Sequence, residues 1–308
     1  MYDLVIIGGG PAGVSAGVYA ARKRLKTVLV AEKIGGQSFD SNEIQNWIGT
    51  EKITGQDLAK AFEGHLRAYA SQGLDIHIGE RVEKIEKTEK GFSVKTNKSA
   101  YDTRAILIAT GGFRKQLEIP GAKEYENKGL TYCASCDGPL FADQDTIVVG
   151  GGNAGFETAA QLLAYAKSVT LLHRGPDFSK ADASTVEAVL KHPNMKALTN
   201  TAPIEIKGGQ FVQSIVVKNT ATGKTSEIPA AGIFVEIGMV PSTDLAKGVV
   251  ELNEWARIKV DPRTQRTSTP GIWAAGDSTD GLFHQNNIAA GDAVKALEDI
   301  YLTLHAQK

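Results

Sequence analysis

Cysteine is scarce in this chain: its 308 residues include only Cys133 and Cys136. So few cysteines exclude a small domain stapled by several disulfides. Long hydrophobic runs are also missing, since none reaches the roughly 20 residues that a membrane-spanning helix needs, and we expect no membrane partner. Residues 1–7 lead straight into a glycine-rich turn, without the basic start and cleavage site of a secretory leader. The expected location is therefore the cytoplasm.

The chain also lacks an excess of charge of either sign. Lys and Arg total 34 and Asp and Glu total 35, which gives a formal net charge of -1. Such a balance produces no long-range field to attract nucleic acid, and we expect no nucleic-acid partner. What is present is 42% hydrophobic residues, ordinary for a globular enzyme, in a length that suits about two domains.

Two segments of the chain repeat one pattern, in which a strand, a glycine-rich turn, a helix and a second strand follow one another. The first copy is predicted as strand 2–7, helix 14–24 and strand 27–31, and the second as strand 145–149, helix 156–166 and strand 168–173. This order is the signature of a dinucleotide-binding fold.

The other segments predict further strands and one helix. Residues 75–110 read as a meander of short strands packed on the first domain, and 116–121, with Pro120-Gly121, are typical of a crossing point. Apolar strands are also expected within 105–111, 230–238 and 271–277, and a final helix at 288–304.

The first turn fits Gly-x-Gly-x-x-Gly with Gly8, Gly10 and Gly13. These glycines allow the tight turn, the approach of a pyrophosphate and close helix packing, and the helix N-terminus then faces the phosphates. Glu32 ends the second strand about 20 residues on, where an acid binds a ribose hydroxyl. A glycine turn without a ligand is the alternative, and the strand, the helix and Glu32 in register argue against it.

The second turn fits with Gly150, Gly152 and Gly155, but its second strand ends in His173-Arg174-Gly175 rather than in an acid. Arg174 and Lys180 could bind the 2′-phosphate of NADPH, which a carboxylate would repel, so this pattern favours NADPH over NADH. The alternative is that both are solvated surface charges.

The Cys-x-x-Cys pair allows three interpretations: a redox disulfide, half a zinc site, or chance. Zinc needs two further ligands, and the six histidines are scattered singly, so we expect no metal. The redox interpretation has support, since this turn lowers the pKa of one thiol and Asp137 could carry the exchanged proton. Asp137 could instead be a capping residue.

Taken together, the motifs make the whole chain similar to the low-molecular-weight thioredoxin reductases, which are class II pyridine nucleotide-disulfide oxidoreductases. The motifs in family order are the first glycine turn, Gly35-Gly36-Gln37, Asn46-Trp47-Ile48-Gly49, Ala109-Thr110-Gly111, Cys133-Ala134-Ser135-Cys136-Asp137-Gly138, the second glycine turn, Ala275-Gly276-Asp277 and His284-Gln285. The cysteine motif placed just before the second turn is the most specific of them.

The resemblance implies an α/β fold with two Rossmann-like three-layer ββα domains, the NAD(P)-binding domain being inserted into the FAD-binding domain. The FAD-binding domain would comprise 1–115 and 245–308, and the NAD(P)H-binding domain 116–244 with the cysteine pair. Pro120-Gly121 and Pro241 would lie near the two hinge strands, about which the inserted domain rotates in this family.

The resemblance also implies residue roles. Cys136 would lie against the flavin, Cys133 would attack the protein substrate and Asp137 would be the acid/base. FAD would be bound by Gly8, Gly10, Pro11, Ala12, Gly13, Glu32, Gly36, Gln37, Asn46, Val82, Ala109, Thr110, Gly111, Gly276, Asp277, His284, Gln285, Asn286 and Ile288. The nicotinamide nucleotide, NADPH or NADH, would be bound by Gly150, Gly152, Asn153, Ala154, Gly155, His173, Arg174 and Lys180.

The implied function is a homodimeric flavoenzyme. Electrons would pass from NAD(P)H through FAD to the Cys133–Cys136 disulfide and on to a thioredoxin or glutaredoxin-like protein. Parts of the chain, including 136–141, also resemble the flavoprotein component of alkyl hydroperoxide reductase without its N-terminal thioredoxin-like domain, so the electron acceptor would be a separate protein, as in a peroxiredoxin system.

Two departures keep alternatives open. Gly175 and Ser179 stand where the family has arginines, which leaves NADH, reduced ferredoxin or a deazaflavin as other possible donors. His284-Gln285-Asn286 replaces Arg-Gln-Ala near the flavin and could change its potential. A flavin-binding redox sensor without turnover is a remote alternative, which the intact cysteine pair and Asp137 disfavour.

Overall fold

The computed structural model describes residues 1–305 and divides the chain into two compact units. The first comprises 1–113 and the chain from Val240 onward, and the second comprises 114–239. The sequence placed these boundaries at 115/116 and 244/245, within five residues of the observed ones. Strands β7 (Gly112–Arg114) and β16 (Met239–Pro241) pair with each other where the chain passes between the units.

One of the predicted crossings between the two units is not where the sequence placed it. The predicted crossing at 116–121 lies inside the second unit, where the Ile206 N–H donates to the Pro120 carbonyl at 2.9 Å. Pro120-Gly121 forms a turn against β12 (Thr201–Gly208) instead of a link between units, which shows that a Pro-Gly signal marks a turn but not its place in the topology.

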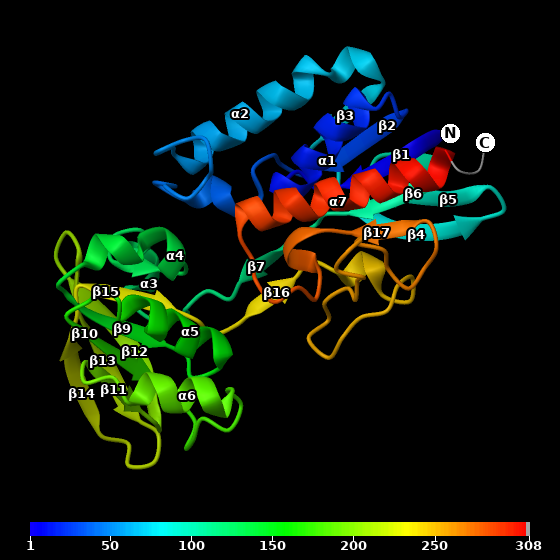
Figure 1. Ribbon diagram of the computed structural model, residues 1–308. Helices are drawn as coiled ribbons and strands as arrows, with labels where there is room; N and C mark the ends of the chain where they lie inside the picture. Colours follow the sequence, from blue (N-terminus) through cyan, green and yellow to red (C-terminus); the bar gives the residue numbers. More distant parts are fainter. Residues whose placement is uncertain (306–308) are drawn as a thin grey trace. The chain divides into compact units, whose positions relative to one another are not determined.

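A seven-stranded sheet forms the first unit, in the order β3-β2-β1-β6-β5-β4 with β17 also paired to β6. The strands are β1 Tyr2–Ile7, β2 Thr27–Ala31, β3 Leu74–Ile78, β4 Val82–Thr88, β5 Gly91–Thr96, β6 Ala100–Ile108 and β17 Ile272–Ala274. Helices α1 (Pro11–Arg22), α2 (Gly55–Ala68) and α7 (Asn286–His305) cover one face (Figure 1). Short 3₁₀ turns occupy Gly36–Asp40, Ala70–Gln72, Asp244–Ala246 and Gly276–Ser278.

The predicted meander is shorter than 75–110. Strand β3 pairs in parallel with β2 and so belongs to the nucleotide-fold half of the sheet, whereas β4, β5 and β6 form the antiparallel meander. The apolar alternation of β3 resembles that of a meander strand, and only its partner distinguishes the two.

Strand β1 shows why this sheet is buried on both faces. Leu4 and Ile6 pack among the helices, while Val5 and Ile7 pack on the opposite side with the meander and the chain near Val250. A strand buried on both faces reads as a continuous apolar run, which is why 2–7 was recognisable as a parallel strand.

The second unit repeats this layout on a smaller scale. Its parallel sheet has the order β11-β10-β9-β15-β8, and an antiparallel sheet has the order β12-β13-β14. The strands are β8 Leu130–Thr131, β9 Asp145–Val149, β10 Ser168–Leu172, β11 Met195–Leu198, β12 Thr201–Gly208, β13 Val212–Asn219, β14 Thr225–Pro229 and β15 Gly232–Val235. The helices are α3 Ala122–Tyr125, α4 Ala134–Asp137, α5 Asn153–Leu162 and α6 Ala183–Leu190, with a 3₁₀ turn at Gly138–Phe141.

Separate apolar clusters join these layers. Ile147 and Val149 of β9 face β12 and β13, whereas Val148 faces Phe156 of α5. Both units therefore have Rossmann-like sheets, and the second is inserted into the first, which confirms the predicted α/β fold class. Among residues 1–305, no helix combines the length and apolar character needed to cross a bilayer.

Both nucleotide-fold helices begin earlier than predicted. Helix α1 begins at Pro11 instead of Val14, and α5 begins at Asn153 instead of Phe156. The expectation started each helix after the glycine motif, but the motif itself contains the first helical turn. Proline is well suited to that turn because its missing N–H would have no helical partner there.

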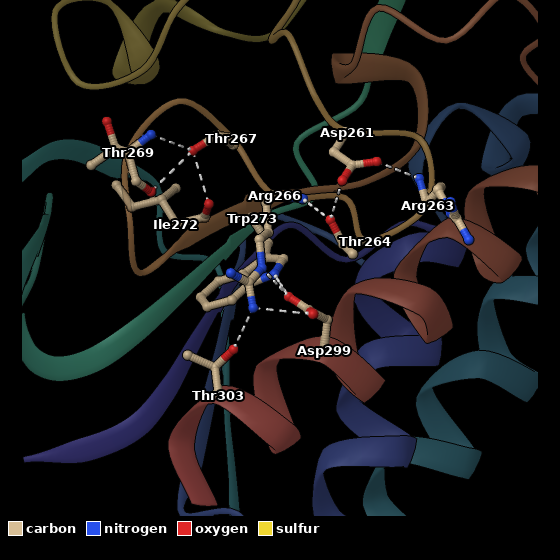
Figure 2. Close-up of polar contacts among 10 residues, drawn as sticks. All are labelled: Asp261, Arg263, Thr264, Arg266, Thr267, Thr269, Ile272, Trp273, Asp299 and Thr303. Atoms are coloured by element: carbon tan, nitrogen blue, oxygen red, sulfur yellow. Dashed lines mark hydrogen bonds and ion pairs between the residues drawn. The ribbon is translucent and has the colours of Figure 1, made fainter. Parts of the chain in front are cut away.

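A partly buried carboxylate connects α7 to β17 (Figure 2). The Asp299 side chain is 16% exposed and accepts a hydrogen bond from Nε1 of Trp273 at 2.8 Å. Arg266 donates to the same carboxylate and to the Thr303 hydroxyl. Because Trp273 is only 2% exposed, its indole N–H depends on Asp299 for a partner.

Replacing Asp299 with Ala should destabilise the first unit by about 1–3 kcal/mol, because the buried indole N–H loses its acceptor. Urea unfolding measures this, with Asp299→Asn as the variant that keeps an acceptor oxygen. Glu187→Ala is the control, since its pair with Lys191 is exposed and should be worth under about 0.5 kcal/mol. Equal, small changes for Asp299→Ala and Glu187→Ala would contradict this account.

Candidate redox and dinucleotide sites

The first glycine turn links β1 to α1 and contains two kinds of glycine. Gly8 has a φ of +120°, and a Cβ there would overlap the Ala109 carbonyl oxygen. A Cβ on Gly13 would overlap the Gly8 carbonyl oxygen, whereas one on Gly10 would meet only the Gly36 Cα, at 3.8 Å. The fold itself requires Gly8 and Gly13. Gly10 borders open space, which fits a pyrophosphate approaching the backbone.

The second turn, between β9 and α5, is built in the same way. Gly150 has a φ of +129° and lies against the Glu236 carbonyl oxygen, and Gly155 lies against the Gly150 carbonyl oxygen. A Cβ on Gly152 would meet nothing within 4 Å. Of the three glycines of the Gly-x-Gly-x-x-Gly motif, the packing therefore requires the first and the third in each turn, and the middle one leaves its outer side free.

Helices α1 and α5 differ from other helices of the chain in how their N-termini are capped. Thr54 caps α2 and Asp182 caps α6, each accepting a hydrogen bond from a first-turn N–H. Gly10 and Gly152, at the starts of α1 and α5, have no side chain for this purpose, and neither first turn contains an acid. Their N–H groups and positive dipole ends are therefore available to an anion such as a pyrophosphate.

Polar side chains from distant segments gather in the first unit. Gln37 donates to Asp277 at 3.4 Å, and Asn46 donates to Gln285 at 3.2 Å. Gly276 lies beside Ala12, since a Cβ added to it would be 3.4 Å from the Ala12 Cβ. The structure thus brings together predicted FAD residues from opposite ends of the sequence.

The remaining predicted FAD residues occupy the surrounding strand ends and loops. Thr110, at the end of β6, donates to the Ser242 carbonyl at 2.6 Å. Glu32 is exposed after β2, and Val82 is buried at the start of β4. Ala109 is buried, His284 and Asn286 are partly buried, and Ile288 is 37% exposed on α7.

Sequence reasoning missed two members of this cluster. The Ser38 hydroxyl donates to Asn286 at 2.8 Å, and the Asn287 side chain donates to the Asn46 carbonyl at 2.6 Å. Each neighbours a residue that was predicted. Ser38 lies in a short 3₁₀ turn and Asn287 at the start of α7, and no local sequence pattern reveals which polar side chain turns inward at such positions.

The loop after β10 defines the expected nucleotide-binding edge of the second unit. Asn153 accepts a hydrogen bond from the Asp182 N–H at 2.7 Å, which joins the start of α5 to this loop. The half-buried His173 ring lies 5.5 Å from the Phe178 ring, and a Cβ on Gly175 would be 2.6 Å from Nε2 of His173. The packing of His173 thus explains the glycine at 175.

Arg174 and Lys180 are both exposed on this edge. Neither forms an ion pair with any residue of the described part of the chain. Two cations without a protein counter-ion are suited to an anionic ligand, although surface lysines and arginines often have this arrangement.

A buried acid, Glu236, also lies beside the second turn and was not singled out by the sequence. Its side chain is 13% exposed and accepts hydrogen bonds from Arg114 and from Thr158, each at 3.0 Å. Burial raises the pKa of this carboxyl, and the nearby Arg114 opposes the shift. An acid that ends an apolar strand is the signal that could have revealed it.

The two cysteines are joined by a disulfide, with their Cα atoms 5.3 Å apart. Cys133 precedes α4, and its carbonyl accepts from the N–H groups of Cys136 and Asp137 at 3.2 and 3.0 Å. Ser135 donates to Gln161 of α5 at 3.1 Å, so the cysteine turn is attached to the helix that begins at the second glycine turn.

Asp137 closes α4 and accepts a hydrogen bond from the Thr131 hydroxyl. It precedes the 3₁₀ turn at Gly138 but makes no side-chain capping bond to it. The Asp137 side chain therefore does not cap this 3₁₀ turn. Within residues 1–305, no group of three His, Cys, Asp or Glu side chains could hold a metal ion.

Comparison with known proteins identifies the family. The model of the family described as pyridine nucleotide-disulphide oxidoreductase matches residues 2–293, and the chain belongs to this family. Its members are oxidoreductases, and membership implies the use of a flavin and a nicotinamide nucleotide.

Solved structures and curated relatives agree with this placement. The chain aligns with thioredoxin reductases from Streptococcus pyogenes (32% identity, TM-score 0.90, 99% of each chain) and Giardia duodenalis (33%, TM-score 0.91, 98% of this chain and 99% of that one). It is 37% identical to an NADH dehydrogenase of Bacillus subtilis and 38% identical to a component of the alkyl hydroperoxide reductase of Staphylococcus epidermidis. It is covered to 96% in both comparisons but spans only 57% of either relative.

These matches confirm the resemblance to thioredoxin reductases that the motifs indicated. The chain is a flavoprotein oxidoreductase with the thioredoxin reductase fold.

Substituting the middle glycine should separate cofactor binding from folding. Gly10→Ala places its Cβ in open space, so the protein should fold but lose at least about tenfold in FAD affinity because the pyrophosphate can no longer approach. Gly13→Ala collides with the Gly8 carbonyl and should lower stability itself. Flavin absorbance per protein and thermal unfolding distinguish the two. Full flavin content in Gly10→Ala would show that the pyrophosphate does not lie at this turn.

Proposed function

We propose that this protein is a disulfide reductase that takes electrons from NADPH or NADH and delivers them to a thioredoxin or glutaredoxin-like protein. The observation that carries the proposal is the placement of the Cys133–Cys136 disulfide in the same compact unit as the second glycine turn. A redox pair tied to the helix of a dinucleotide turn suits an enzyme that exchanges electrons between a nucleotide and protein thiols.

FAD is assigned to the first unit. Gly10 borders the space for its pyrophosphate, and the linked side chains of Gln37, Asp277, Asn46 and Gln285 supply polar partners. When bound, the flavin accepts a hydride from a nicotinamide nucleotide and makes two electrons available to the disulfide.

The nicotinamide nucleotide is assigned to the second unit. Gly152 and the uncapped start of α5 would receive its pyrophosphate, and Arg174 and Lys180 provide positive charge at the ribose end. The alternative donors, reduced ferredoxin and a deazaflavin, gain nothing from a second complete dinucleotide turn, so the nicotinamide nucleotide is the better supported choice.

The reduced cysteines have different proposed roles. Cys133 stands at the N-terminus of α4, a position that favours the thiolate, and we assign it the attack on the substrate disulfide. Cys136 then attacks Cys133, which releases the reduced substrate and reforms the internal disulfide. Asp137, adjacent to Cys136 in sequence, would transfer protons between thiols and the leaving sulfur. Assembly as a homodimer remains a prediction from the resemblance.

A second candidate acceptor is a peroxidase. It is favoured by the 38% identity with a component of an alkyl hydroperoxide reductase. The chemistry at Cys133 and Cys136 would be the same, and only the protein that docks beside the pair would differ.

Replacing Cys136 with Ser tests the electron path. The variant should keep its flavin and be reduced by NAD(P)H, but lose protein-disulfide reduction by at least about a thousandfold, because the dithiol cannot reform. Flavin bleaching in a stopped-flow instrument and a thioredoxin reduction assay measure the two steps. Lys191→Ala, at the exposed position directly after α6, is the control. The assignment is wrong if Cys136→Ser still reduces protein disulfides.

Arg174→Ala tests the nucleotide site. Loss of a charge-assisted hydrogen bond to the 2′-phosphate should raise the KM for NADPH about tenfold and leave the KM for NADH within about twofold. Steady-state kinetics with both nucleotides provide the comparison, and Lys191→Ala is again the control. Equal changes for NADPH and NADH would remove Arg174 from phosphate recognition.

A further inference from the structure

Thr131 is a buried polar residue next to the redox pair to which neither the motifs nor the proposed function gives a role. It ends β8, is 6% exposed, and is held in register by the pairing of β8 with β15, where it lies opposite Phe234. The parallel sheet therefore fixes its position before the chain turns into the cysteine segment.

The Thr131 hydroxyl makes two hydrogen bonds, both to the cysteine turn. It donates its proton to the Asp137 carboxylate and accepts from the Cys133 N–H at 3.3 Å. A hydroxyl has one proton to donate, and here it is given to the carboxylate. One buried oxygen thus connects the backbone of Cys133 with the carboxylate that follows Cys136.

Other buried strand threonines show the ordinary way of satisfying this side chain. Thr27, Thr103 and Thr146, none more than 1% exposed, each donate to a backbone carbonyl at 2.9–3.0 Å. Such bonds keep a buried hydroxyl satisfied and need no further role. Thr131 differs because its proton goes to an acid that the proposed function uses.

We propose that Thr131 is a positioning residue for thiol–disulfide exchange, whose hydroxyl fixes the orientation of the Asp137 carboxylate beside the cysteine turn. The inference rests on the acid/base role proposed for Asp137. A carboxyl group held in one orientation can exchange its proton with the sulfur atoms of the reacting cysteines, whereas a freely rotating one is seldom in place.

The proton transfers during thiol–disulfide exchange show at which steps the orientation of Asp137 matters. The Cys133 thiolate attacks the substrate disulfide, the substrate S–S bond breaks, and the departing sulfur takes the proton of Asp137. The Cys136 thiol then gives its proton to the Asp137 carboxylate and attacks the Sγ of Cys133. This step releases the second substrate thiolate and reforms the internal disulfide. Two electrons move from the cysteine pair to the substrate, and Asp137 ends as it began.

Thr131→Val is the direct test because valine has the shape of threonine without the hydroxyl. Reoxidation of the reduced enzyme by a small alkyl disulfide, whose departing sulfur must be protonated, should slow about tenfold, and the midpoint of its pH profile should move about one unit upward because the Asp137 carboxylate loses a hydrogen-bond donor. Thr131→Ser should restore both values. Thr146→Val, which removes a buried hydroxyl from β9 of the same sheet, is the matched control and should change neither the rate nor the midpoint.

A double-mutant cycle with Asp137→Asn completes the experiment. If Thr131 acts through Asp137, Thr131→Val should have little further effect in the Asp137→Asn background. The proposal would be overturned if the effects of the two substitutions on the rate multiply. It would also be overturned if Thr131→Val slows the reaction without moving the midpoint of the pH profile. Flavin content checks folding, and Thr131→Ala undergoes the same measurements if the valine variant does not fold.

The outcomes also separate this inference from the proposed function. If the wild-type dithiol does not react with disulfides, the proposed function itself fails. If Asp137→Asn has no effect, the acid/base role of Asp137 fails, and the role of Thr131 fails with it. If the dithiol reacts and Asp137→Asn slows the reaction, but Thr131→Val behaves as wild type, only the role of Thr131 is rejected.

Discussion

The contact between a helix and the turn that precedes it controls the architecture of both units. A Cβ on Gly13 would lie 1.9 Å from the Gly8 carbonyl oxygen, and one on Gly155 would lie 1.9 Å from the Gly150 carbonyl oxygen, so neither position has room for a side chain. This contact starts α1 and α5 directly at the ends of β1 and β9, so their uncapped N–H groups lie at the carboxyl edge of each parallel sheet. Ligands of open α/β sheets bind at that edge, and the polar residues of the candidate sites are arranged around it.

Several parallel strands of the two units can be predicted from sequence because they are buried on both faces. The continuous apolar runs at 2–7, 27–31 and 145–149 match β1, β2 and β9 residue for residue. The starts of α1 and α5 were missed by three residues, since the glycine motif looks like a loop although it contains the first helical turn. The role of β3 was missed because its alternation fits either a parallel strand or a meander.

In the candidate sites, the types of residue could be predicted from sequence motifs, whereas many of the contacts between them could not. Motifs identify which residue types gather at a site, and the structure supports the grouping of Gln37 with Asp277 and of Asn46 with Gln285. Contacts that depend on pairing between distant strands carry no local signal. Thr131, whose hydroxyl donates to Asp137, is itself held by the pairing of β8 with β15, and Glu236 meets Arg114 across a separation of 122 residues.

In the proposed function, the Cys133–Cys136 disulfide is a second two-electron redox centre, in equilibrium with the flavin. Anaerobic reductive titration of the flavin-loaded protein, followed by flavin absorbance and by thiol counting, measures it directly. The wild type should take up four electrons, two for the flavin and two for the disulfide, and a variant with both cysteines replaced by serine should take up two. A wild type that takes up only two electrons, with its flavin fully bleached and its disulfide intact, would contradict the account.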